Sequence, residues 1–137
     1  MNGGNLICTT SGANCIAQRA TISALDAQVK EIKYMIDEFN GRRKIILELL
    51  KSIRGFKVNN PDGAFYVFPD ISSFFGKKIK NKIIKNSNDF ALFLLEEAHV
   101  ATVTGEAFGN NNCIRISYAA SEKNILEAIK RIKKALS

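Results

Sequence analysis

The chain has 137 residues, of which 46% are hydrophobic, so length and composition predict a packed domain and exclude a disordered chain. It has neither the roughly 18 consecutive apolar residues that cross a bilayer nor a signal peptide at its N-terminus, which favours a cytoplasmic protein without a membrane partner. The formal charge of +7 permits a nucleic-acid partner, but five lysines crowd into 77–85 and favour a solvated loop instead.

The first part of the chain is predicted to be a loop followed by helices. Residues 1–12 are rich in Gly, Thr and Ser, and 13–27 predict a short helix. Over 28–54 an apolar stripe at alternating spacings of three and four predicts one long helix: Val29, Ile32, Ile36, Phe39, Ile46, Leu50 and Ile53. Gly41 is expected to kink or weaken this helix, and Gly55 lies where a left-handed cap would end it.

The remainder predicts strands and helices in alternation. Strands are expected at 64–68, 100–103 and 113–119 because these segments are apolar, aromatic or β-branched. A helix capped by Asn86 or Ser87 should present Phe90, Phe93, Leu94 and Ala98, and one capped by Ser121 should present Ile125, Ala128, Ile129, Ile132 and Leu136. This order favours an α+β fold: one small antiparallel or mixed sheet covered by helices, with a long bridging helix.

The titratable residues form no complete catalytic set or metal site. The cysteines, Cys8, Cys15 and Cys113, lack zinc-site spacing and are interpreted as reduced thiols, with Cys113 buried. The single histidine, His99, lies near a predicted helix end, where a structural role is common. Asp70 closes a strand and fits a turn former as well as a catalyst.

Arg115 is the candidate binding residue. In the predicted strand 113–119, Ile114 and Ile116 should face the core while Arg115 and Ser117 face the other side. A planar guanidinium fixed on a strand is well suited to binding a carboxylate through two parallel hydrogen bonds. A solvated strand face or a local ion pair is the competing interpretation.

Five segments, in chain order, resemble motifs of one known family. They are Thr9–Gln18 (T-S-x-x-x-S-I-A-Q), Phe39–Arg43 (F-x-x-R-R), Pro61–Pro69 (P-x-G-A-F-Y-x-F-P), Val100–Gly109 (V-A-x-V-P-G-x-A-F-G) and Ile114–Ala119 (I-R-[LI]-S-Y-A). Together they resemble the C-terminal part of a class I, fold type I, pyridoxal-phosphate-dependent aminotransferase of the aspartate aminotransferase branch. Thr104 stands where the pattern has proline, so the turn before Gly105 is expected to be looser.

The resemblance implies a role for several residues and a division of the chain. Residues 1–54 would be a loop and bridging helices linked to a missing large domain, and 55–137 the small C-terminal domain. Arg115 would bind the substrate's α-carboxylate, and Phe65 would lie near the substrate unless it is a core aromatic. Thr10 and Ser11 would lie in a loop that approaches the partner's site in a homodimer. The substrates would be an amino acid, aspartate or glutamate, and a 2-oxo acid.

The family's cofactor residues are missing from this sequence. No lysine lies in the S-x-S-K context of the Schiff-base lysine, and the aspartate that pairs with the pyridine nitrogen and most of the phosphate cup are absent. The resemblance therefore implies a chain that holds no pyridoxal 5'-phosphate alone and is incomplete as a catalyst. It would be a fragment, a piece of a split enzyme or an inactive remnant. A basic α+β module that binds nucleic acid is the alternative function.

Overall fold

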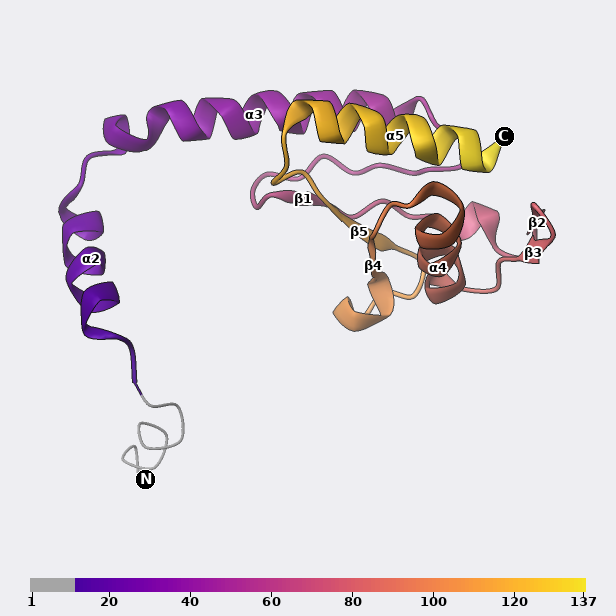
Figure 1. Ribbon diagram of the computed structural model, residues 1–137, viewed down its shortest axis with the longest axis horizontal. Coiled ribbons are helices and arrows are strands. Elements are labelled where there is room, and N and C mark those ends of the chain that lie inside the picture. The colour runs from indigo at the N-terminus through magenta and orange to yellow at the C-terminus, as the bar shows by residue number, and fades with distance from the viewer. Residues whose placement is uncertain (1–11) are drawn as a thin grey trace. The chain divides into compact units, whose positions relative to one another are not determined.

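The computed structural model describes residues 12–137 (Figure 1). The chain forms two compact units: the first ends at Ile36, and the second is Asp37–Ser137. The first unit holds helix α2 (Cys15–Asp26) and the start of helix α3 (Val29–Lys51). Asn14 caps α2 because its side chain accepts a hydrogen bond from the Ile16 amide at 2.8 Å. Both predicted helices are confirmed.

The predicted apolar stripe of α3 is buried only in its C-terminal part. Ile46 and Leu50 lie in the core of the second unit, whereas Val29 and Ile32 are exposed. The helix continues through Gly41 and ends at Lys51. Gly55 follows with a φ of +104°, in the left-handed region that favours glycine, and a Cβ there would meet the Phe74 ring at 2.7 Å.

The second unit is built on a three-stranded antiparallel sheet with β5 (Ile114–Ser117) in the middle (Figure 1). Strand β1 (Tyr66–Val67) pairs with β5 through Tyr66 opposite Ser117, and β4 (Val103–Thr104) pairs with it through Val103 opposite Arg115. All three predicted strands are present but shorter. The strand expected at 100–103 begins only at Val103 and ends at Thr104. The predicted α+β class with a small antiparallel sheet is confirmed.

Residues 77–85, predicted as a loop, contain a β-hairpin of β2 (Lys78–Ile79) and β3 (Lys82–Ile83). Lys80 and Asn81 form its two-residue turn with φ values of 43° and 70°, as a type I′ turn requires. Lys82 forms an ion pair with Glu96 and another with Glu97 at 3.3 Å, so the hairpin is tied to the next helix. The expectation of a loop was wrong for this segment, although most of its lysines are exposed, as a solvated segment requires.

Helices α4 (Ser87–Ala98) and α5 (Glu122–Leu136) cover the core of the second unit together with the C-terminal part of α3, and α4 and α5 both begin at the predicted caps. In α4 the Asn86 side chain accepts from the Asp89 amide, and in α5 Ser121 accepts from the Asn124 amide. His99 ends α4 in the left-handed conformation with a φ of 53°. Short 3₁₀ helices, η1 (Ser72–Phe74) and η2 (Gly105–Phe108), complete the unit. The core includes Ile46, Leu50, Val67, Phe90, Phe93, Leu94, Ile114, Ile116, Tyr118, Ile125, Ile129 and Ile132.

The two cysteines in the described part, Cys15 and Cys113, are free thiols, the first exposed and the second buried as predicted. Among residues 12–137 no helix has both the length and the apolar character needed to cross a membrane.

Candidate functional site

Strand β5 fixes the direction of the Arg115 side chain. Its neighbours Ile114 and Ile116 are buried in the core, so Arg115 leaves the opposite face of the strand, as alternation predicted. Because β5 has a paired strand on each side, its backbone is held along both edges. The backbone that carries the guanidinium is therefore fixed. The Arg115 side chain is half-buried.

Two aromatic rings flank the Arg115 guanidinium. Its Cζ lies 5.4 Å from the centroid of the Tyr66 ring and 4.6 Å from that of Phe108. Contacts of this kind hold a guanidinium against the face of a ring. They leave the N–H groups at the edge of the guanidinium available for hydrogen bonds. In the part of the chain that the structure describes, Arg115 forms no ion pair. A local ion pair, one competing interpretation of this arginine, is therefore not what the structure contains.

A glycine turn positions Phe108. The Gly105 amide donates to the Cys113 carbonyl at 2.8 Å, and a Cβ on Gly105 would lie 2.2 Å from the Asn110 carbonyl oxygen, so no other residue fits. Thr104 caps η2 by accepting from the Glu106 amide, and its hydroxyl lies 2.8 Å from that of Ser87. Thr104 therefore ties the turn to α4 instead of loosening it.

Phe65 lies just before β1 and the residue is 54% exposed, so it is not a core aromatic. Its ring packs edge to face on Tyr66 with centroids 6.0 Å apart, and Phe68 packs in the same manner on Phe108. Phe65, Tyr66, Arg115, Phe108 and Phe68 thus form a row of contacts, which we call the Arg115 aromatic row. Through it the structure brings the predicted residues Phe65 and Arg115 into one neighbourhood.

The remaining predicted site residues, Thr10 and Ser11, lie outside the described residues. Among residues 12–137 no group of three or more His, Cys, Asp or Glu side chains is arranged to hold a metal ion.

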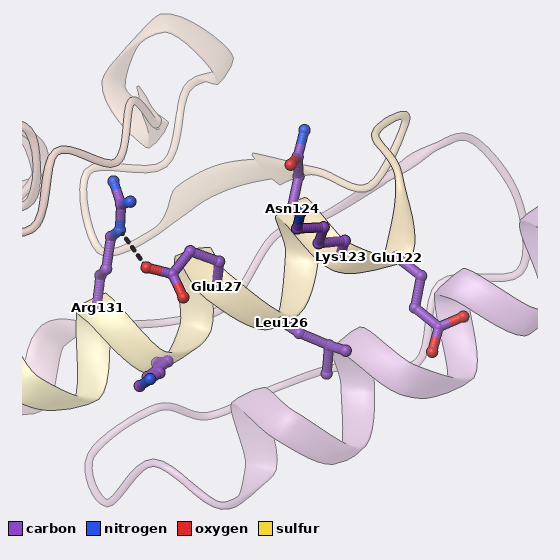
Figure 2. Close-up of a pocket in the computed structure, with 7 residues that line it drawn as sticks. Glu122, Lys123, Asn124, Leu126, Glu127 and Arg131 are labelled. Atoms are coloured by element: carbon purple, nitrogen blue, oxygen red, sulfur yellow. Dashed lines mark hydrogen bonds and ion pairs between the residues drawn. The ribbon is translucent and has the colours of Figure 1, made fainter.

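A pocket of about 760 Å³ lies along exposed residues of α5, and no member of the Arg115 aromatic row lines it (Figure 2). All its lining residues are exposed, so it is a surface depression rather than an enclosed site. Glu127 and Arg131 form an ion pair across it at 2.8 Å, which lowers the pKa of the Glu127 carboxyl. Its lining residues are Glu122, Lys123, Asn124, Leu126, Glu127, Lys130 and Arg131.

Sequence reasoning missed the residues that flank and support Arg115. Tyr66 could have been found by pairing the two strands, because antiparallel register places it opposite Ser117, two residues from Arg115. The position of Phe108 beside Arg115 cannot be predicted from strand pairing, because η2 and its glycine turn determine it. The sequence indicates Tyr118 only as part of a motif. In the structure its hydroxyl donates a hydrogen bond to the Ala64 carbonyl.

Comparisons with known proteins show which family the chain resembles. A family model described as aminotransferase class I and II matches residues 5–132. An aspartate aminotransferase of Pinus pinaster is 42% identical over 132 residues, covering 93% of this chain and 27% of the pine protein. A probable aspartate/prephenate aminotransferase of Rickettsia felis is 44% identical over 128 residues, covering 93% of this chain and 31% of that protein.

The structural comparison finds a protein of the same kind. The crystal structure of the aspartate aminotransferase from Rhizobium meliloti superimposes with a TM-score of 0.84 at 37% identity, covering 95% of this chain and 34% of that one. The chain thus spans between a quarter and about a third of the length of these relatives. Nucleic-acid binding is not favoured, since these relatives are all aminotransferases by name.

Proposed function

The chain belongs to the class I and II aminotransferases, and on that premise we propose that it forms the C-terminal part of an enzyme that moves an amino group between an amino acid and a 2-oxo acid. Aspartate or glutamate is the proposed amino donor, in keeping with the names of its relatives. Residues 55–137 would be the small domain of that enzyme, and 1–54 its link to a large domain.

We propose that Arg115 binds the α-carboxylate of the substrate. The observation that carries this role is a half-buried guanidinium that forms no ion pair among residues 12–137 and is oriented by two aromatic rings on a doubly paired strand. Every amino acid and 2-oxo acid carries this carboxylate, so one fixed planar cation serves both substrates. Phe65 and Phe108 would shield the ion pair from water, which strengthens it.

The residues around Arg115 do not fit the family's cofactor on their own. Pyridoxal phosphate requires a lysine amine, an acid at its ring nitrogen and a phosphate site, and it then supplies an electron sink. The groups in contact with the Arg115 guanidinium are the Tyr66 and Phe108 rings. We therefore assign this chain substrate binding and orientation, and expect the isolated chain to show neither cofactor absorbance nor turnover.

A chimera tests this function. The chain would replace the matching C-terminal segment of the Rhizobium meliloti aspartate aminotransferase, whose structure superimposes on it. We expect the chimera to transaminate aspartate. Arg115→Lys should lower kcat/KM by roughly 30- to 150-fold, because an ammonium cannot make the two-pronged contact.

Arg131→Ala is the matched control, since Arg131 is an exposed arginine whose ion pair, among residues 12–137, is with Glu127. It should leave kcat/KM within twofold. Retention of most activity by Arg115→Ala would contradict the carboxylate role, and an inactive but folded and cofactor-loaded chimera would contradict the proposed function. Homodimer formation, with Thr10 and Ser11 near the partner's site, and a cytoplasmic location stay predictions.

A further inference from the structure

The segment that enters β1 has a backbone conformation that needs support. Ala64 adopts a φ of +64°, in the left-handed region, although it is not glycine. Phe65 and Tyr66, two members of the Arg115 aromatic row, follow at once. The direction in which the chain leaves Ala64 therefore determines where the Tyr66 ring meets the guanidinium.

Tyr118 supports this segment at two consecutive carbonyls. Its hydroxyl donates to the Ala64 carbonyl at 2.7 Å and its amide donates to the Phe65 carbonyl at 2.8 Å. The side chain is only 1% exposed and packs on the Phe39 ring, so its position is fixed by the core. Burial raises the pKa of the Tyr118 hydroxyl, which keeps it protonated as a donor.

Arg43 holds the beginning of the same segment from α3. Its Nη1 donates to the Pro61 carbonyl at 2.6 Å, and among residues 12–137 it forms no ion pair. Its Nε is buried and has no hydrogen-bond partner in that part of the chain. A buried N–H group without a partner is costly to a fold, so the placement of this guanidinium against the Pro61 carbonyl points to a role in fixing that loop.

We propose that Tyr118 and Arg43 are positioning residues for the Arg115 site. They hold 61–65 so that the Tyr66 ring lies against the guanidinium and the Phe65 ring lies against Tyr66. Tyr118 follows the strand that carries Arg115, so one segment supplies the cation and also sets the position of the ring beside it. That the site binds a carboxylate rests on the proposed function; the positioning itself does not.

The direct test is nitrogen-15 NMR of the complete chain. The Arg115 Nε–H resonance, assigned by its loss in Arg115→Lys, is sensitive to the ring currents of Tyr66 and Phe108. Tyr118→Phe removes only the hydroxyl and should displace this resonance. Tyr34→Phe, the same change at an exposed tyrosine, should not.

Arg43→Gln removes the guanidinium from the other end of the segment and should displace the same resonance. This variant also provides the test if Tyr118→Phe fails to fold. An Arg115 resonance that keeps its wild-type position in a folded Tyr118→Phe or Arg43→Gln variant would overturn the proposal.

Kinetics of the chimera give a second readout. Tyr118→Phe should raise KM for aspartate by roughly three- to tenfold with kcat within twofold, because one hydrogen bond that orients the site is lost. Tyr34→Phe should change neither. If Arg115→Ala leaves activity intact, the carboxylate role of Arg115 fails while the NMR result still decides the positioning. An unchanged KM in Tyr118→Phe beside a strong Arg115→Lys effect overturns the positioning role alone.

Discussion

Asp70 is held as a turn former by its own neighbours. Its side chain accepts a hydrogen bond from the Ser72 amide at 2.7 Å, and its backbone bridges Lys57 on one side and Cys113 on the other. Hydrogen bonds from the Ser72 side chain and amide, with the nearby Lys57 charge, lower the pKa of the Asp70 carboxyl. The structure thus supports the turn interpretation of this residue, with the carboxylate form preferred in the folded chain.

Stability should therefore depend on pH through Asp70. A carboxyl whose pKa is lower in the folded state stabilises the fold above its unfolded pKa of about 4, and this contribution disappears as the pH falls through the folded pKa. Asp70→Asn should lower the free energy of unfolding by about 0.5–1 kcal/mol at pH 7 and by almost nothing near pH 2. Urea unfolding across this range measures the difference. Ser72→Ala should weaken the same pH dependence, and a constant difference at all pH values would contradict this account.

At the scale of elements, α3 contains a glycine that the fold does not require. Gly41 lies inside the helix, and a Cβ there would meet no atom within 4 Å. Gly41→Ala should raise the free energy of unfolding by about 0.5–1 kcal/mol, because alanine loses less backbone entropy in a helix. The comparison variant is Gly105→Ala, where the carbonyl contacts near 2.2 Å should make the change strongly destabilising. Urea unfolding of both variants checks the contrast, and a destabilising Gly41→Ala would contradict it.

The elements predictable from sequence were those specified by local patterns. Residues that are close in sequence specify the caps Asn86 and Ser121 and the apolar face of α5. The structure confirms all of these features. The β2–β3 hairpin was missed because its turn uses Lys80, a residue with no left-handed preference, and each of its strands has only two residues, one of them lysine. For the site, alternation predicted the outward direction of Arg115. Alternation could not predict that the rings of Tyr66 and Phe108 lie beside Arg115, because their positions depend on strand pairing and on the Gly105 turn.

At the scale of the whole molecule, the first unit exposes apolar side chains in a periodic pattern. Exposed residues there include Leu25, whose side chain is 80% exposed, along with Ile22, Val29 and Ile32. Exposed apolar side chains of this kind promote association when nothing covers them. The chain should therefore associate in a concentration-dependent manner, as sedimentation velocity would detect.

Charge placed on this surface should reverse the association. The double variant Leu25→Lys with Ile32→Lys is expected to shift the sedimentation profile toward the monomer. Leu126→Lys, at a single exposed leucine on α5, is the control and should leave the profile unchanged. A wild-type chain that stays monomeric at high concentration would contradict this expectation.

The central position of β5 has a consequence for how the protein is made. Its partners β1 and β4 both leave the ribosome earlier, and the bond between Tyr118 and Ala64 joins groups 54 residues apart. Neither edge strand can pair in this sheet until the segment carrying Arg115 has been synthesised. Long-range pairing of this kind closes late and slowly. The Arg115 site and the sheet that supports it therefore form together, in one step, once β5 has been synthesised.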